Sequence, residues 1–220
     1  VMGGIADYSG SLVLQMPIAE ATFVAIRKNT TRTYRLRTGA IEGGTFEIPV
    51  AELSRLTSYE DARGLFANRP GGDWAAYVLG CFVVLSQECA ASFTEGCNIQ
   101  IHSDVPISMS VSSSAAIEVA AMQAITKAFE VSLDRFPGLV PAVPCSRGMK
   151  VGMLCQKVEN LVVGAPCGIM DQIASNMGQQ NRLLALLCRP AEIQGMVDIP
   201  AGAEFWGLDS GHKHAVGGHA

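Results

Sequence analysis

Charged residues are scarce in this sequence, and positive charge is not in excess. Only 16% of the 220 residues are Asp, Glu, Lys or Arg, and 16 basic residues stand against 20 acidic ones, for a formal net charge of −4. A protein that binds a nucleic acid or an anionic membrane needs an excess of cations to neutralise its partner. The composition therefore argues against both partners and favours a small-molecule ligand.

The sequence also lacks hydrophobic runs of membrane-spanning length. The longest run, AAYVLGCFVVL at 75–85, is too short to cross a bilayer. The first residues show neither the basic nor the apolar region of a signal peptide, and the chain begins with Val1 rather than Met. We therefore expect no membrane span, and we expect a further segment upstream of Val1.

Paired cysteine motifs are missing as well. The seven cysteines are odd in number, and none belongs to a C-x-x-C pair. Their surroundings in the sequence are apolar, which favours reduced core residues of a cytoplasmic protein. These residues are Cys81, Cys89, Cys97, Cys145, Cys155, Cys167 and Cys188.

Hydrophobic residues make up 49% of the chain, enough for a substantial core. Period-2 or continuous apolar runs predict strands, and 3.6-residue spacing predicts helices. The predicted strands are 11–16, 21–27, 45–49, 97–102, 183–188 and 204–209, and the predicted helices are 73–88, 114–130, 150–163 and 170–177. The chain begins with predicted strands and continues with a mixture of strands and helices. This order indicates an α+β domain with a mixed sheet and helices packed on it. The proline-rich stretch 135–148 is expected to be a surface loop.

A cluster of three serines precedes one predicted helix, in the stretch VPISMSVSSSAA at 105–116. A helix N-terminus exposes unpaired N–H groups that bind phosphate, and the hydroxyls of Ser112 to Ser114 can add hydrogen bonds or reach a metal. The simpler interpretation is that one serine caps the helix and the others are small packing residues.

Two carboxylates flank a Gly- and Pro-rich turn in VENLVVGAPCGIMDQ at 158–172. Glu159 lies on a predicted helix and Asp171 begins another, so both can face one cleft. One carboxylate can bind Mg²⁺ while the other accepts a proton from a hydroxyl, as phosphoryl transfer requires. A glutamate on a helix face and an aspartate in a first helical turn are the structural alternative.

Two further stretches give weaker signals. In MGGIADYSG at 2–10, Asp7 and Tyr8 precede a strand, where an aspartate can accept sugar hydroxyls or simply form a turn. In DSGHKHAVGG at 209–218, His212 and His214 have no third ligand at convincing spacing, so we expect no metal there.

Taken together and in this order, these segments resemble the galactokinase branch of the GHMP sugar kinases, and most of all its L-arabinokinases. The stretch from Pro106 to Ala116 is similar to the family motif P-x-G-x-G-L-S-S-S-A-A, and PCGIMDQ at 166–172 matches a family signature without change. DYSGSLVLQMPIAEA and DWAAYVLG are similar to other family segments. The resemblance covers nearly the whole chain.

The resemblance implies a ribosomal-protein-S5-domain-2-like α+β fold and an ATP- and Mg²⁺-dependent sugar-1-kinase. By position, Asp171 is the implied base at the anomeric hydroxyl, Glu159 and Ser114 the implied Mg²⁺ ligands, and Asp7 a residue that binds ring hydroxyls. The other implied sugar-binding residues are Tyr8, Gly4 and Gly168, and the implied ATP-binding residues are Ser108, Ser110, Ser112, Ser113, Ser114, Ala115, Trp74 and Tyr77.

One difference from the family bears on the substrate. Galactokinases read G-E-H-T-D-Y, with a Glu-His pair that faces the C6 hydroxymethyl group of galactose, whereas this chain has Gly4 and Ile5 there. L-Arabinose shares the galactose configuration at C2 to C4 but lacks C6, so the resemblance favours L-arabinose. A galactokinase and a catalytically inactive sugar sensor are the alternatives.

Two departures bear on activity. Ser108 and Ser110 replace two motif glycines; serine is costly there if the loop needs positive φ and harmless if it does not. The family's A-P-G-R segment, its third glycine-rich motif and its second domain have no counterpart in residues 1–220. We expect an N-terminal kinase domain truncated at both ends and inactive as it stands, and its oligomeric state is not predicted.

Overall fold

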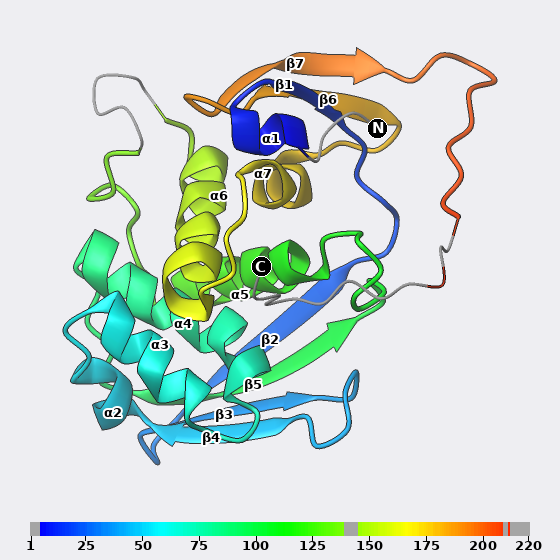
Figure 1. Cartoon of the computed structure of the whole chain (residues 1–220). Helices are drawn as coiled ribbons and strands as arrows, with labels where there is room; N and C mark the ends of the chain where they lie inside the picture. The colour runs from blue at the N-terminus through cyan, green and yellow to red at the C-terminus, as the bar shows by residue number, and fades with distance from the viewer. Residues whose placement is uncertain (1–4, 139–144, 209–210, 212–220) are drawn as a thin grey trace.

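Two β-sheets enclose a layer of helices in the computed structural model, which describes residues 5–138, 145–208 and 211 (Figure 1). The strands are β1 (Leu12–Gln15), β2 (Thr22–Asn29), β3 (Thr33–Thr38), β4 (Thr45–Pro49), β5 (Gly96–Ser103), β6 (Arg182–Leu187) and β7 (Glu192–Asp198). The helices are α1 (Ile5–Ser9), α2 (Val50–Ser54), α3 (Tyr59–Ala67), α4 (Gly72–Cys89), α5 (Ser113–Ala128), α6 (Arg147–Lys157), the π-helical turn η1 (Val158–Val163) and α7 (Met170–Met177).

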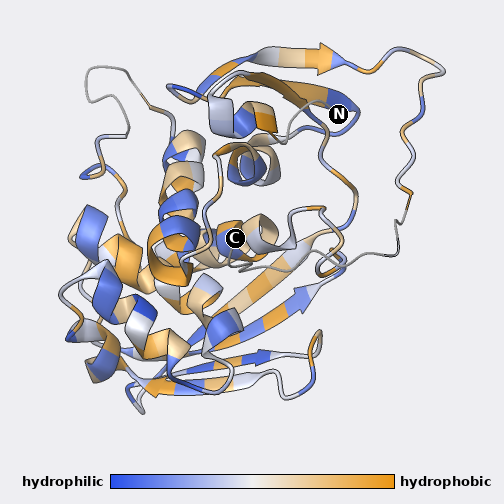
Figure 2. Cartoon of the chain, in the orientation of Figure 1, coloured by the Kyte–Doolittle hydropathy of each residue, from blue (hydrophilic) through white to orange (hydrophobic). Residues whose placement is uncertain are grey.

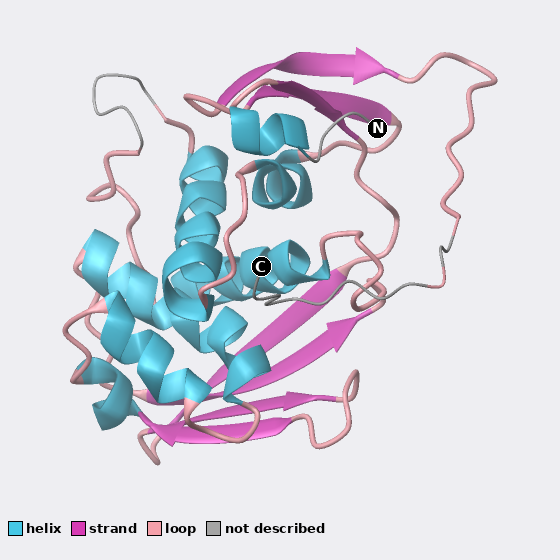
Figure 3. Cartoon of the chain, viewed as in Figure 1, coloured by secondary structure: helices cyan, strands magenta, loops and turns pink. Residues whose placement is uncertain are grey.

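The larger sheet is mixed, as predicted. Its strand order is β2-β5-β3-β4, with β3 and β5 parallel and the other pairs antiparallel. The smaller sheet, β1-β6-β7, is antiparallel and lies on the opposite side of the helices (Figure 3). The fold is therefore α+β, although the sequence indicated one sheet rather than two.

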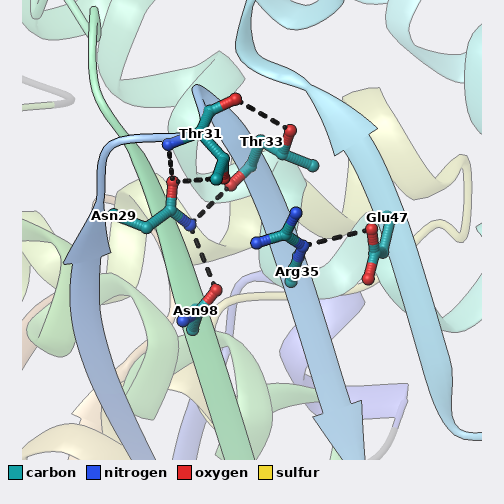
Figure 4. Close-up of polar contacts among 6 residues, drawn as sticks. All are labelled: Asn29, Thr31, Thr33, Arg35, Glu47 and Asn98. Atoms are coloured by element: carbon teal, nitrogen blue, oxygen red, sulfur yellow. Dashed lines mark hydrogen bonds and ion pairs between the residues drawn. The ribbon is translucent and has the colours of Figure 1, made fainter.

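Buried and exposed side chains alternate along the strands of the larger sheet, and the buried ones lie on the face that meets the helices. Tyr34 and Leu36 of β3 and Phe46 and Ile48 of β4 are buried, and the residues between them point to the other face. On that outer face, Arg35 donates from Nε to Glu47 Oε2 at 3.2 Å across the β3–β4 pair (Figure 4). Hydrophobic residues thus gather between the sheets and polar ones outside (Figure 2).

The turn between β2 and β3 is held by the Asn29 side chain. Its amide donates to the Thr33 carbonyl at 3.0 Å and to Asn98 Oδ1 at 3.1 Å, while its Oδ1 accepts from the Thr31 N–H at 3.2 Å (Figure 4). An asparagine that bonds the backbone two residues later is a common turn former. The turn sets β3 beside β5 and so completes the larger sheet.

Helix α4 is the centre of the core. Most of its residues are buried, because α3, α5, α6 and η1 all pack on it. Phe82 lies 4.4 Å from Tyr34 of the sheet and 4.8 Å from Phe93, measured between ring centroids.

No helix in the described ranges is long and apolar enough to cross a membrane. The seven cysteines are free, and five of them are buried, as expected.

Most of the predicted elements are confirmed, with corrections. The predicted strand at 204–209 is wrong: residues 204–208 are exposed and form no strand, and 209 lies outside the described residues. The predicted helix 150–163 begins earlier, at Arg147, and ends in η1, so the predicted loop 135–148 ends sooner. The sequence patterns missed β3, β7, α1, α2 and α3.

Helix α4 approaches η1 at Gly80. A Cβ on Gly80 would lie 2.8 Å from Val158 Cγ1 and 3.2 Å from Val162 Cγ1, whereas a Cβ on Gly64 of α3 would meet nothing within 4 Å. Overpacking costs typically about 1–3 kcal/mol, and Gly→Ala in a helix otherwise gains about 1 kcal/mol.

We expect Gly80→Ala to lower the free energy of unfolding and Gly64→Ala to raise it. Because the helix-propensity gain is common to both variants, their difference isolates the packing at the α4–η1 contact and should be about 2 kcal/mol. Urea denaturation followed by circular dichroism measures both values. Equal stabilities for the two variants would show that α4 and η1 can move apart at no cost.

Candidate active site

The serine loop before α5 has an unusual backbone. Ser108, Ser110 and Ser112 have φ of 60°, 56° and 62°, in the left-handed region, and Met109 and Val111 between them do not. Loops that alternate in this way can turn successive backbone N–H groups toward one side, where they bind anions. Both positions at which glycine is replaced thus need positive φ, and each serine there costs about 1–2 kcal/mol relative to an unstrained conformation.

The serine hydroxyls do not cap the helix. Ser112 occupies the N-cap position of α5, but its side chain makes no capping hydrogen bond. Instead the Ser112 hydroxyl faces the Asp171 carboxylate and lowers its pKa. Ser114, two residues later, acts in the same way on the Glu159 carboxylate. The capping interpretation is therefore wrong, and the start of α5 holds both predicted carboxylates.

Glu159 lies in the π-helical turn η1. A π-turn contains one extra residue per turn and often occurs at functional sites. Gly164, with φ of 84°, ends it, and the N–H groups of Gly164 and Ala165 both donate to the Glu159 carbonyl, at 2.9 and 3.0 Å. Arg63 of α3 donates to the carbonyls of Asn160 and Leu161, both at 3.1 Å. The backbone around Glu159 is thus fixed from two sides.

Burial dominates the electrostatics of both carboxylates. Desolvation raises the pKa of Glu159, and hydrogen bonds from Ser114, Cys167 and Gln172 oppose that rise. Burial also raises the pKa of Asp171, with a further rise from the nearby charge of Asp7, while the hydrogen bond from Ser112 opposes it. Two partly desolvated carboxylates so close together favour the binding of a cation or a proton.

Asp7 binds the backbone of the signature turn. Its Oδ1 accepts from the Ile169 N–H at 3.0 Å and its Oδ2 from the Met170 N–H at 3.2 Å, at the start of α7. A Cβ on Gly168 would lie 1.8 Å from Asp7 Oδ2, so only glycine fits there. The Tyr8 hydroxyl donates to the Pro166 carbonyl at 3.2 Å. These contacts fix Asp171, the next residue of α7.

Three of the four predicted sugar-binding residues lie at this one turn: Asp7 contacts Gly168, and Tyr8 contacts Pro166. Asp7 is 7% exposed and engaged with backbone, and Tyr8 is largely exposed. Gly4 lies outside the described residues, as do His212 and His214. A direct role of Asp7, Tyr8, Gly4 and Gly168 in sugar binding stays a prediction.

Two cavities meet at the serine loop. The first, of about 430 Å³, is largely apolar and contains Trp74, Tyr77, Ser108, Ser113 and Ser114 in its lining. The second, of about 540 Å³, is lined by Asp171, Ser110 and Ser112 among others. Both sizes are typical of small-molecule sites. Ala115 is fully buried and lines neither cavity, so its contact with ATP stays a prediction.

The oxygen atoms near Glu159 fit a magnesium ion. Mg²⁺ is usually held by one or two carboxylates together with substrate phosphates, rather than by a complete protein cage. Ser114 lines the first cavity and supplies a hydroxyl, and the buried Glu159 carboxylate lies next to that hydroxyl. Within the described ranges no group of three or more His, Cys, Asp or Glu is arranged to hold a metal.

Sequence reasoning missed two residues of this site. Gln172 donates from Nε2 to Glu159 Oε2 at 2.8 Å, and its place in the quoted signature PCGIMDQ was the available signal. Arg63, which fixes η1, gave none, because a lone arginine on a polar helix face is ordinary.

Comparison with known proteins places this geometry in a family. Residues 76–179 match the family described as GHMP kinases N terminal domain. L-Arabinokinase of Arabidopsis thaliana is 42% identical over 99% of this chain, which spans 22% of that protein. A galactokinase of Mannheimia succiniciproducens is 29% identical over 97% of this chain, which spans 48% of that protein.

Solved structures share the fold. Lactococcus lactis galactokinase, crystallised with galactose, aligns with a TM-score of 0.71 at 23% identity, over 90% of this chain and 44% of that one. Methanococcus jannaschii mevalonate kinase aligns with a TM-score of 0.64 at 16% identity, over 91% of this chain and 52% of that one. The chain thus spans about a fifth of the L-arabinokinase and about half of these other kinases. The chain belongs to the GHMP kinases and contains the N-terminal domain of that family.

Proposed function

We propose that residues 1–220 form the sugar- and ATP-binding domain of a kinase that transfers the γ-phosphate of ATP to the anomeric hydroxyl of L-arabinose. One observation carries the proposal: Ser112 and Ser114, at the start of one helix, face Asp171 and Glu159, and each serine lines one of two cavities. A donor and an acceptor bound on either side of this loop would bring phosphate and hydroxyl together at Asp171.

The first cavity suits ATP. Trp74 and Tyr77 supply an aromatic wall for the adenine, and Ser113 and Ser114 bring the N-terminus of α5 to the phosphates. Glu159 and Ser114 would hold Mg²⁺, which would neutralise the charge of the phosphates. The alternating left-handed serine loop can add backbone N–H groups for the phosphates, and its Ser108 lines this cavity.

Asp171 orients or deprotonates the acceptor hydroxyl. It lines the second cavity, and its raised pKa brings its proton affinity closer to that of a general base. The Ser112 hydrogen bond fixes which way the carboxylate points. Asp7 and Gly168 place Asp171 by anchoring the turn before it, so their effect on the sugar is indirect at least in part.

L-Arabinose is the proposed acceptor because Gly4 and Ile5 replace the Glu-His pair of galactokinases. The C6 hydroxyl of galactose would then lose its partners, at a cost of about 1–3 kcal/mol if it is buried unsatisfied. The 42% identity to an L-arabinokinase, against 29% to a galactokinase, supports the same choice. A cytoplasmic location suits the free cysteines and a nucleotide substrate.

Asp171→Asn in the full-length protein should lower kcat by about 10²- to 10⁴-fold, because the amide keeps the shape but cannot accept the proton. A coupled assay of ADP release measures the rate, and Asp198→Asn, at a side chain 81% exposed on β7, is the matched control. A kcat for Asp171→Asn close to that of the control would remove Asp171 from the chemistry.

The substrate is tested by kcat/KM for both sugars. We expect L-arabinose to exceed galactose by about 5- to 150-fold, the ratio that corresponds to 1–3 kcal/mol. The double substitution Gly4→Glu with Ile5→His should narrow that ratio by raising the value for galactose. A higher kcat/KM for galactose in the unmodified protein would make it a galactokinase.

Relief of strain in the serine loop is the third test. Ser108→Gly and Ser110→Gly should each stabilise the loop by about 1 kcal/mol and tighten Mg·ATP binding, because glycine adopts positive φ freely. Ser113→Gly, at a helical position without positive φ, should instead lower stability. Calorimetry measures Mg·ATP and sugar binding in parallel. Sugar binding without Mg·ATP binding in the unmodified protein would favour the second candidate, a sugar sensor, which Ser108 and Ser110 in place of the motif glycines suggest.

A further inference from the structure

Glu118 is a fully buried acid that the proposed reaction does not use. It lies on α5 one turn after Ser114, with 0% of its surface exposed. The titratable groups that face it are Glu159 of η1, Cys81 of α4 and Cys155 of α6, and the amide of Gln172 approaches from α7. None of the ion pairs among the described residues includes Glu118. A buried carboxylate without a cation needs another explanation.

The hydrogen bonds of Gln172 supply that explanation. Its Nε2 lies 2.8 Å from Glu159 Oε2 and 3.4 Å from Glu118 Oε2, so its two N–H groups can serve the two acids, with a longer contact of 3.6 Å to Cys167 Sγ. The reverse orientation of the amide would place its carbonyl oxygen against the Glu159 carboxylate. The orientation with Nε2 toward Glu159 is therefore the stable one.

Two buried oxygens of this group have no partner among the described residues: Glu118 Oε1 and Gln172 Oε1. If Glu118 is ionised, both are acceptors without a donor, at a cost of about 1–3 kcal/mol each. A proton on Glu118 Oε1 turns one of them into a donor, and the carboxamide that already donates to Glu118 Oε2 carries the other as an acceptor. A neutral acid and a carboxamide can then pair through two hydrogen bonds, as N–H to O and O–H to O.

We propose that Glu118 is a positioning residue for Glu159: as a neutral acid it pairs with the Gln172 carboxamide and keeps the amide N–H on the Glu159 carboxylate. The proposal rests on the proposed function for the role of Glu159 as the Mg²⁺ ligand. Burial and the nearby charge of Glu159 raise the pKa of Glu118 well above its usual range, which agrees with the neutral form.

The arrangement lets one helix control Glu159 twice. Ser114 and Glu118 are four residues apart, so they lie on the same face of α5. The Ser114 hydroxyl lowers the pKa of Glu159 directly, and Glu118 reaches Glu159 through Gln172. Partners behind a metal ligand of this kind typically change metal affinity or activity by about 10–100-fold when they are replaced.

The test compares Glu118→Gln with Glu118→Met in the full-length protein. A glutamine can donate to Gln172 Oε1 and accept from Nε2, so Glu118→Gln should keep kcat and the Mg²⁺ requirement near those of the unmodified protein. Methionine has a similar size but cannot form these hydrogen bonds. Glu118→Met should therefore raise the Mg²⁺ concentration needed for half-maximal rate about 10–100-fold, with little change in the KM for sugar. Equal effects of both substitutions, or none from Glu118→Met, would overturn the proposal.

Two measurements do not depend on turnover. The infrared spectrum of the unmodified protein minus that of Glu118→Gln should contain the carbonyl band of a neutral carboxylic acid; carboxylate bands instead would overturn the proposal. Mn²⁺ bound together with ADP, followed by electron paramagnetic resonance, should be weaker in Glu118→Met than in Glu118→Gln. If no sugar is phosphorylated, the proposed function fails, while these two measurements still decide the role of Glu118.

Discussion

Two carboxylates, the buried Glu159 and the half-buried Asp171, are the constraint around which this domain is built. An ionised acid out of water is costly unless hydrogen bonds or cations compensate it. Ser112 and Ser114 at the start of α5 provide one hydroxyl for each. Because those hydroxyls are only two residues apart, the start of α5, the turn η1 and the start of α7 must all converge on one place.

The surrounding packing maintains that convergence through close contacts at small residues. Gly80 lets α4 approach η1, and a Cβ on Gly152 of α6 would lie 2.3 Å from Ile173 Cδ1 of α7. Gly168 leaves room for the Asp7 carboxylate, which binds two N–H groups at the start of α7. In a close-packed interior such contacts cannot relax independently. The positions of the two acids therefore depend on residues distant from them in the sequence.

Residue patterns predicted the long elements and the order of the motifs, and failed where tertiary contacts decide. Helices α4 and α5 are long and strongly apolar, so their periodicity was clear. Strand β3 alternates Tyr34 and Leu36 with charged residues over only six positions, and α3 depends on a capping box between Ser58 and Asp61. The segment 204–208 is apolar but finds no strand to pair with. In the site, the sequence indicated both acids, but the serine partner of each depends on how α5, η1 and α7 meet.

The serine loop shows how the same contacts bear on strain. Left-handed φ at Ser108, Ser110 and Ser112 persists only if the surrounding structure compensates for it. The Ser112 hydroxyl stabilises the ionised form of Asp171, an interaction that a glycine could not make. Ser108 and Ser110 make no such contact with either acid, and instead each lines one of the two cavities. The strained residue Ser112 therefore contributes to the position of the proposed base, Asp171. The strained residues Ser108 and Ser110 instead lie next to the cavities where ligands would bind.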